Sequence, residues 1–379
     1  MTVILTNARL VLEEEVVQGT IAFGFDGITD VSRAPTAVPG AIDMEGDFVS
    51  PGLIECHTDN LEKHFMPRPR VFWPNPLAAA LAHDAQMVAA GVTTVYDALC
   101  AGGFDEENDY RREIFADMVD AVERGVAERL FRIDHRIHLR CELTDWRLPQ
   151  ILEAHVDRPL VRFASLMNHT PGERQWRNVD HFKAFIMSDG RSEAEADAMI
   201  AGRIARSQEA VASNIGPVAA LLRDKGVPLA SHDDTLPEHV ADAEALGCTI
   251  SEFPTTVEAA RAARALGLAP VGGAPNVVRG GSHTGGVSIG ELARAGLIDA
   301  LSSDYVPSAL LQAIPRLAGT VGLSLHEAFA LVTWRVADML GLSDRGRLSP
   351  GLAADVLRVR FAGETPVVRG VWRAGRQVF

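Results

Sequence analysis

The chain has 379 residues, with 36 Lys and Arg against 50 Asp and Glu, which gives a formal net charge of −14. Hydrophobic residues make up 47% and charged residues 23%, as in an ordinary globular protein of one to three domains. The acidic excess excludes proteins that coat nucleic acid and proteins that bind an anionic membrane surface, because both partners are themselves negative.

The four cysteines indicate a reducing compartment. They are isolated, with no CxxC spacing, which argues against a disulfide framework or a structural zinc site: Cys56, Cys100, Cys141 and Cys248. The N-terminus has no basic segment before an apolar one, and no apolar run reaches the roughly 18 residues that a spanning helix needs. We therefore expect a cytoplasmic protein without a membrane partner. A homodimer is compatible with the sequence, since two-fold dimers are the commonest assemblies.

The two ends of the chain are predicted to be β-rich. Short alternating runs separated by Gly and Asp, such as TVILTNARLVLE and VVQGTIAFGF, fill the first 50 residues, and DVLRVRF and PVVRGVWRAG follow near the C-terminus. This pattern predicts one small β-sandwich-like domain formed by residues 1–50 and 343–379.

The middle of the chain, residues 51–342, alternates short β-branched runs with helical stretches. Eight such strands between about residues 49 and 304 predict an α/β fold, a (β/α)8 TIM-type barrel. A doubly wound sheet is the competing fold, but no GxGxxG opens a helix. Residues 171–223 are too long for a simple loop and predict a helical insertion over the barrel mouth.

Potential metal ligands follow the predicted strands. His57 and Asp59 alternate with Thr58, so an extended chain turns both to one side, where an imidazole and a carboxylate suit a first-row metal ion. Taken alone, such a pair is more often a histidine capped by a nearby acid than a metal site. Similar endings recur on other strands, and the carboxyl ends of barrel strands share one rim. The predicted metal site comprises His57, Asp59, Glu142, His169, His232 and Asp304.

Two basic loops follow predicted strands. Arg68 and Arg70 lie in PRPR, and Arg279 and His283 lie in the glycine-rich NVVRGGSHTGG. Arginine grips phosphate with two hydrogen bonds, and glycine lets backbone amides approach an anion. A single loop of either kind is more often a solvated turn. Beside a metal rim, the two loops predict a phosphate-binding site, with two further candidate contacts in Lys63 and His83.

Several motifs together resemble the amidohydrolase superfamily: PGLIECHTD, GVTTV and GRLSPGLAADVLRV. Longer blocks, including HTDNLEKHFMPRPRVFW, SLMNHTPGERQ and GAPNVVRGGSHTGG, resemble the PhnM-type diphosphatases of the carbon–phosphorus lyase pathway. The first-strand motif departs from the superfamily's HxH, because Asp59 stands in the second place. No lysine ends a barrel strand, so Glu142 is the candidate for the position of the usual carboxylated lysine.

The resemblance implies a metal-dependent hydrolase acting in phosphonate catabolism. One or two divalent ions, zinc first and manganese or iron as alternatives, would activate water against α-D-ribose 1-methylphosphonate 5-triphosphate and release pyrophosphate. Asp304 would accept the proton of the water. Two alternatives stay open: hydrolysis of a C–N bond by a deacetylase or cyclic amidase on the same barrel, and a non-catalytic subunit of a phosphonate-degrading complex.

Overall fold

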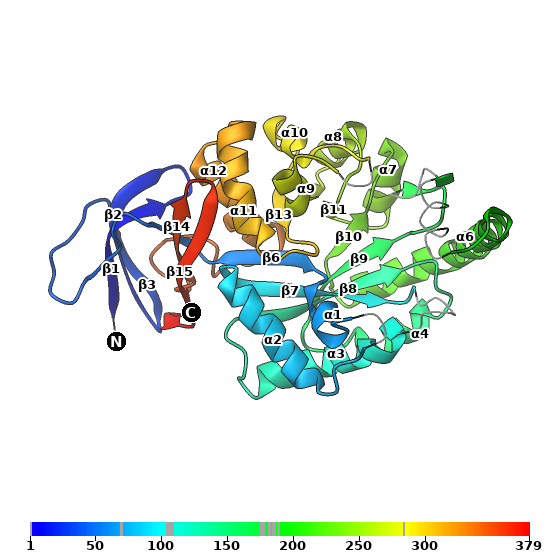
Figure 1. Ribbon diagram of the computed structural model, residues 1–379, viewed down its shortest axis with the longest axis horizontal. Helices are drawn as coiled ribbons and strands as arrows, with labels where there is room; N and C mark the ends of the chain where they lie inside the picture. The colour runs from blue at the N-terminus through cyan, green and yellow to red at the C-terminus, as the bar shows by residue number, and fades with distance from the viewer. Residues whose placement is uncertain are drawn as a thin grey trace.

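The computed structural model describes residues 2–68, 71–103, 110–174, 179–180, 183, 187, 190–282 and 285–379. Figure 1 shows a large body of strands and helices with a smaller all-β body at one end. The smaller body contains both chain termini, as the sequence predicts.

The larger body is an eight-stranded parallel barrel, which confirms the predicted fold. Neighbouring strands are consecutive in the chain, and a parallel bridge between Thr58 and Asp304 joins the last strand to the first. The barrel strands are β6 (Leu53–Thr58), β7 (Val92–Ala101), β8 (Asp134–Glu142), β9 (Val161–Met167), β10 (Leu229–His232), β11 (Ile250–Glu252), β12 (Ala269–Gly273) and β13 (Ala300–Ser302). Glu142 therefore ends the third barrel strand.

Helices cover the outside of the barrel, and apolar side chains fill it. Tyr96 and Phe163 are buried in an interior cluster with Ile54 and Val271, so the lower barrel is a packed core. The helices are α1 (Asn60–Phe65), α2 (Pro76–Ala89), α3 (Tyr110–Ala127), α4 (Leu148–His155), α6 (Glu193–Asp224), α7 (Pro237–Ala245), α8 (Val257–Ala265), α9 (Ala274–Arg279), α10 (Ile289–Arg294), α11 (Ala309–Arg316), the π-helix η2 (Leu317–Val321), α12 (Leu325–Ala330) and α13 (Trp334–Met339).

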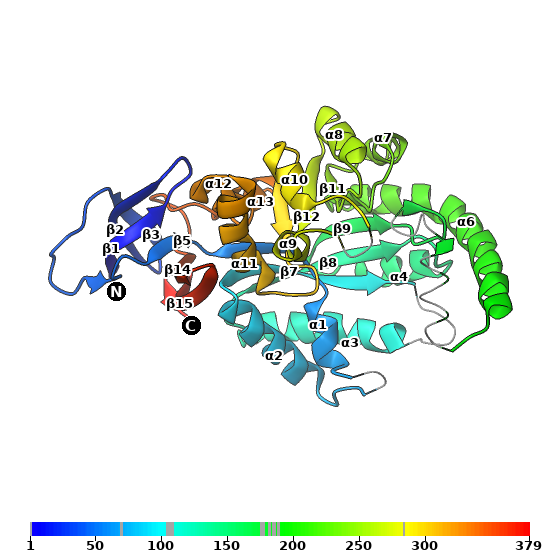
Figure 2. The same cartoon turned by 45° about the horizontal axis from the view of Figure 1, so that its top comes forward.

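Helix α6 occupies much of the segment predicted to be a helical insertion. Ser192 begins it with a capping box, in which its hydroxyl and the Glu195 carboxylate satisfy each other's backbone amides. In both ribbon views α6 lies at the end of the molecule away from the terminal sheet (Figure 2). Within the described ranges, every helix is too short or too polar to cross a bilayer.

The smaller body is one mixed sheet built from both ends of the chain. Its strands are β1 (Val3–Val11), β2 (Val16–Gly24), β3 (Gly27–Ser32), β4 (Ile42–Asp43), β5 (Phe48–Pro51), β14 (Val356–Ala362), β15 (Thr365–Arg373) and β16 (Arg376–Gln377). β5 pairs with β1 on one side and β14 on the other, and then continues into barrel strand β6. Leu5, Phe23, Val356 and Trp372 share its buried core.

The turn between β15 and β16 permits only glycine at position 375. Gly375 has a φ of +75°, and a Cβ atom there would lie 2.1 Å from the carbonyl oxygen of Gly24. We expect Gly375→Ala to lower the free energy of unfolding by on the order of 2–4 kcal/mol. Gly363→Ala is the matched control, because Gly363 has a φ of +63° with open space around it. It should cost only about 1–2 kcal/mol. Equal losses in urea titrations of the two variants would show that the contact with Gly24 is unimportant.

Candidate active site

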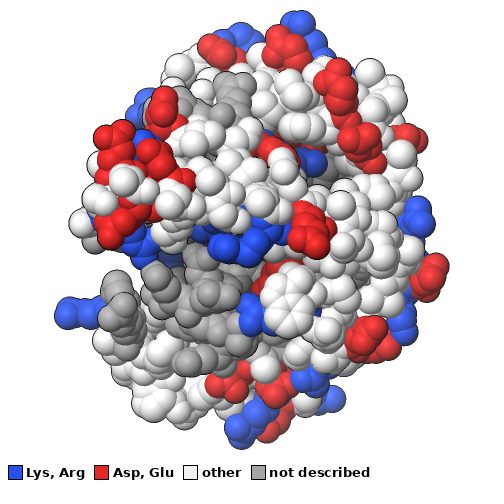
Figure 3. All heavy atoms as spheres, turned by 90° about the vertical axis from the view of Figure 1, so that its right-hand side faces the viewer, with Lys and Arg blue, Asp and Glu red and all other residues white. Residues whose placement is uncertain are grey.

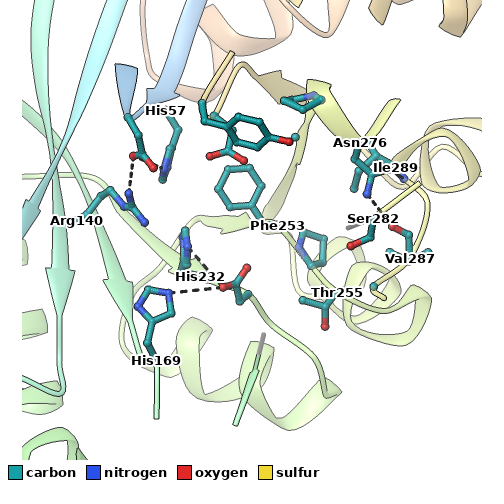
Figure 4. Close-up of a pocket in the computed structure, with 18 residues that line it drawn as sticks. His57, Arg140, His169, His232, Phe253, Thr255, Asn276, Ser282, Val287 and Ile289 are labelled. Carbon is teal, nitrogen blue, oxygen red and sulfur yellow. Dashed lines mark hydrogen bonds and ion pairs between the residues drawn. The ribbon is translucent and has the colours of Figure 1, made fainter. Parts of the chain in front are cut away.

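A cavity of about 270 Å³ opens where the barrel strands end. Figure 4 shows His57 and Arg140 on one side of it, His169 and His232 on a second side, and Ser282 on a third. Five of the six predicted metal ligands line it: His57, Asp59, His169, His232 and Asp304. The structure therefore brings these five together from four separate strand ends.

The seam that closes the barrel runs through this site. The backbone amide of Asp59 donates to the carbonyl of Asp304 at 2.8 Å, and the amide of Asp304 donates to the carbonyl of His57 at 3.1 Å. His57 Nε2 lies 3.7 Å from Asp59 Oδ1. One ligand atom from each of the three side chains falls within 4.8 Å of the others. The hydrogen bonds that close the barrel therefore also hold these three residues together.

A second group lies beside the first, with the rings of His57 and His232 stacked 5.7 Å apart. His169 Nε2 and His232 Nε2 lie 3.9 Å and 3.7 Å from Asp233 Oδ2. These three residues also have ligand atoms within 4.8 Å of one another. Asp233 is thus brought to the site beside its neighbour His232, while the next residue, Asp234, is fully buried and accepts hydrogen bonds from Ser231 and Ser251.

Backbone strain concentrates at this cavity. Asp233, Phe253 and Asp304 line it and have φ values of 56°, 55° and 54°, in the left-handed region that residues with a Cβ atom disfavour. Each lies one or two residues after the last residue of a barrel strand. Strained residues of this kind persist where the surrounding structure holds them, and they cluster at functional sites. The left-handed backbone at these positions directs the three side chains into the cavity.

Glu252 is a buried carboxylate that the sequence reading missed. Its two oxygens lie 3.0 Å from His57 Nδ1 and 3.2 Å from His232 Nδ1. Burial alone would raise the pKa of Glu252, but attraction to His57 and His138 outweighs it and holds the pKa well below its usual value. The carboxylate therefore accepts both Nδ1 hydrogens, which leaves both Nε2 atoms free to face the cavity. A signal existed, because Glu252 ends the strand ISE just as Glu142 ends RCE.

Glu142, the sixth predicted ligand, lies outside the cavity lining and contacts His169 instead. Its Oε2 atom is 2.5 Å from His169 Nδ1, and its Oε1 accepts the hydroxyl of Thr144 at 2.7 Å. Burial opposes ionisation, but the neighbouring His169 dominates and lowers the pKa of Glu142 to about 2. In this geometry Glu142 orients His169, as Glu252 orients the other two histidines.

Arg140, like Asp233, is a further residue that the sequence analysis did not predict. It lies on β8 two positions before Glu142, and its Nη1 atom donates to Asp59 Oδ1 at 2.5 Å. Burial would raise the pKa of Asp59, but Arg140 and His57 together lower it. Among the residues that the structure describes, Arg140 is the one lysine or arginine in the cavity lining. It places a fixed positive charge beside the first group.

The predicted basic loops contribute less than expected. Arg68 and Arg279 are exposed and lie outside the cavity lining, and Lys63 donates through Nζ to the backbone carbonyl of Tyr305. Arg70 and His283 lie outside the described residues. The glycine-rich loop nevertheless reaches the cavity, which Ser282, Gly286 and Val287 line. Figure 3 views this end of the molecule and shows Lys and Arg side chains across its middle, between acidic groups nearer the rim.

His83 is part of a separate buried cluster. It is fully buried, its Nε2 lies 2.7 Å from Asp97 Oδ1, and its Nδ1 lies 3.0 Å from Asn60 Nδ2. The other oxygen of Asp97 is 2.8 Å from His135 Nδ1. Both ring nitrogens of His83 are engaged, so this structure does not bring His83 to the cavity.

The cluster makes stability depend on pH. Burial would lower the pKa of His135, but Asp97 and Asp84 raise it to about 9, and the same attraction lowers the pKa of Asp97 to about 2. The stabilisation from charged His135 is complete below pH 6.5, its unfolded value, and is lost as pH rises through 9. We expect the free energy of unfolding to fall by on the order of 1–3 kcal/mol over that window. In denaturant titrations at a series of pH values, His135→Gln should make the free energy of unfolding depend less on pH in this window. An unchanged pH dependence would contradict the role assigned to His135.

The donor sets fit divalent metal ions. Each group joins imidazole nitrogen to carboxylate oxygen, the ligand types of zinc and of manganese or iron, and its histidines carry buried carboxylates on their other nitrogen. A further cluster, of His83, Asp97 and His135, is wholly buried, with direct hydrogen bonds between its members. The two groups at the cavity are therefore the better candidates to hold catalytic ions.

Comparisons with known proteins agree with the fold. The chain is 41% identical to α-D-ribose 1-methylphosphonate 5-triphosphate diphosphatase of Escherichia coli (strain K12), over 99% of this chain and 100% of that protein. A solved 5-methylcytosine deaminase from Klebsiella pneumoniae superimposes with a TM-score of 0.67 at 15% identity, covering 99% of this chain and 98% of that one. An amidohydrolase crystal structure superimposes with a TM-score of 0.64 at 17% identity, covering 100% of this chain and 98% of that one. No protein-family model matches.

Proposed function

The chain belongs to the family of α-D-ribose 1-methylphosphonate 5-triphosphate diphosphatases, within the amidohydrolase superfamily. On this premise we propose that it hydrolyses that triphosphate to pyrophosphate and the ribose 1-methylphosphonate 5-phosphate in phosphonate catabolism. The observation that carries the proposal is the identity of 41% along essentially the whole chain. The cavity supports it, because its histidines and carboxylates suit metal-assisted hydrolysis.

Two sets of side chains would hold the divalent ions, zinc being the first candidate. His57, Asp59 and Asp304 form one set, and His169, His232 and Asp233 form the other, with Glu142 and Glu252 fixing the histidines. A bound ion would polarise a phosphoryl oxygen and lower the pKa of water. Arg140 would neutralise part of the negative charge on the triphosphate while keeping its contact with Asp59.

Asp304 is the proposed general base. It is partly buried, and burial together with the negative charge of Asp59 raises the pKa of its carboxyl group. A raised pKa suits a group that must take a proton from water near neutral pH. The water oxygen would attack the α-phosphorus as the bond to the β-phosphate oxygen breaks, so that pyrophosphate leaves and Asp304 retains the proton. The charged, phosphorylated substrate and four free, buried cysteines support a cytoplasmic site of action.

The proposal is tested by a substrate panel under matched conditions. Purified protein is incubated with the ribose 1-methylphosphonate triphosphate, ATP, N-acetylglucosamine 6-phosphate and dihydrouracil, before and after chelation and after readdition of metal. We expect pyrophosphate from the first substrate, loss of activity on chelation, and recovery with zinc or manganese. Cleavage of a C–N bond without pyrophosphate release would instead support the amidohydrolase alternative. Absence of turnover with every metal would favour a non-catalytic subunit.

A further inference from the structure

A second and larger pocket lies at the opposite end of the barrel from the active-site cavity. Its volume is about 810 Å³, within the range of small-molecule sites. Asp134 and His135, at the start of β8, line it, whereas Arg140, near the end of the same strand, lines the cavity. Its other wall is the turn between β15 and β16 of the terminal sheet. The pocket therefore lies between the terminal sheet and the barrel.

Buried carboxylates anchor both walls of this pocket. Asp84 is fully buried and accepts the backbone amides of Arg132 and Ile133 at 2.8 Å and 3.2 Å, which fixes the loop before β8. On the other wall, Asp355 accepts the amide of Ala374 at 2.7 Å. Next to it, Gly375 packs directly against the backbone at Gly24. The pocket is thus formed by the fold before any ligand arrives.

The lining is basic in a protein of net charge −14. Four arginines line it, and Asp134 is the one acidic residue among them: Arg129, Arg132, Arg373 and Arg376. Two of these arginines have acidic partners: Arg132 Nη1 lies 2.7 Å from Asp84 Oδ2, and Arg373 Nη2 lies 3.8 Å from Asp134 Oδ1. Among the described residues, neither Arg129 nor Arg376 has an ion-pair partner, and they face the pocket from opposite walls. A ligand with two or more negative charges could contact both arginines and so bridge the two walls of the pocket.

A buried donor and two aromatic rings complete the lining. His135 is only 1% exposed, and its Nε2 makes no hydrogen bond, with Asp84 Oδ1 at 3.5 Å. The Asp84 carboxylate is within ion-pair distance of this nitrogen and is its partner inside the protein. Phe131 lies over the His135 ring at a centroid distance of 4.1 Å, and Phe25, at the pocket edge, is 68% exposed. Flat apolar surface beside arginine is the combination that binds an aromatic base next to phosphate.

We propose that this pocket is a second ligand site, which binds a small phosphorylated aromatic compound of the nucleotide class. Its phosphates would lie between Arg129 and Arg376, with the ring against Phe25 and Phe131. This inference is independent of the proposed reaction, because the two sites share no residue.

The test is calorimetric titration of the full-length protein with ADP, pyrophosphate and adenosine. ADP should bind one site per chain, pyrophosphate more weakly, and adenosine not measurably. The double variant Arg129→Ala/Arg376→Ala should weaken ADP binding at least tenfold. Both residues are exposed and without ion-pair partners among the described residues, so the melting temperature should stay unchanged. Phe25→Ala should weaken the binding of ADP more than the binding of pyrophosphate. This difference would measure the contact with the aromatic base separately from the contacts with phosphate.

Two controls separate this site from the active site. Arg369→Ala removes an exposed arginine from β15 outside the pocket lining and should leave ADP binding unchanged. Asp304→Asn alters the active-site cavity and should also leave it unchanged. No ADP binding at millimolar concentration, ADP binding that survives the double variant, or ADP binding abolished by Asp304→Asn would each overturn the proposal. Triphosphate hydrolysis should be normal in the double variant, so the two proposals fail or succeed separately.

Discussion

Asp304→Asn is expected to lower kcat by about 10³-fold, near the middle of the range for removing a general base. The amide retains an oxygen that can contact a metal ion but cannot take a proton from water. Asn also keeps the backbone hydrogen bonds that join Asp304 to His57 and Asp59 across the seam of the barrel. The variant should therefore fold normally and retain part of its metal, as measured by elemental analysis beside steady-state kinetics.

The matched control for this variant is Asp242→Asn, which makes the same chemical change at an exposed position on α7. It should keep the wild-type kcat and metal content. A fully active Asp304→Asn enzyme would remove the role assigned to Asp304. A variant that lost activity only in proportion to its metal would make Asp304 a ligand and not a base.

Glu252→Gln should weaken metal binding by about 10- to 100-fold, as measured for other residues that orient metal-binding histidines. Glu252 accepts hydrogen bonds from His57 and His232 at once, one on each oxygen. A glutamine has one acceptor oxygen, so one histidine must turn or change its tautomer. We expect reduced metal content, activity recovered at high metal concentration, and a lower melting temperature, because the substitution also removes a fully buried negative charge between histidines.

Glu258→Gln, an exposed change on α8, is the control for Glu252→Gln. Competition with a chromogenic chelator measures metal affinity directly and does not depend on turnover. Wild-type affinity in Glu252→Gln would mean that the two histidines do not need this carboxylate. Lost activity at wild-type affinity would instead place Glu252 in the chemical step.

The strand-end pattern predicted the barrel and much of the cavity for one physical reason. Parallel strands deliver the residues that follow them to a common rim, so His57, His169, His232 and Asp304 meet although 247 residues separate the first from the last by their numbers. The same reasoning, applied to the strand ISE, would have found Glu252. Arg140 was also accessible, since it shares a face of β8 with Glu142.

What the sequence could not predict was which side chains turn inward. Arg68 and Arg279 come after barrel strands, yet both are exposed, Arg279 at the end of helix α9, because the direction of a side chain beyond a strand depends on tertiary contacts that spacing does not encode. From the sequence, Glu142 and Glu252 could each be a metal ligand or a hydrogen-bond partner of a histidine. Only their contacts with histidine Nδ1 atoms in the structure distinguish the two roles. The left-handed backbone at Asp233 and Asp304 was equally invisible, since neither residue is a glycine.

The most direct measurement is phosphorus NMR of the ribose 1-methylphosphonate triphosphate hydrolysed in water enriched in oxygen-18. Attack at the α-phosphorus places one labelled oxygen on the 5-phosphate of the sugar product and leaves pyrophosphate unlabelled. We predict that pattern, with no product after chelation of the metal. Label in pyrophosphate, release of single phosphate groups, or an intact triphosphate in the presence of every divalent metal would contradict the proposed function.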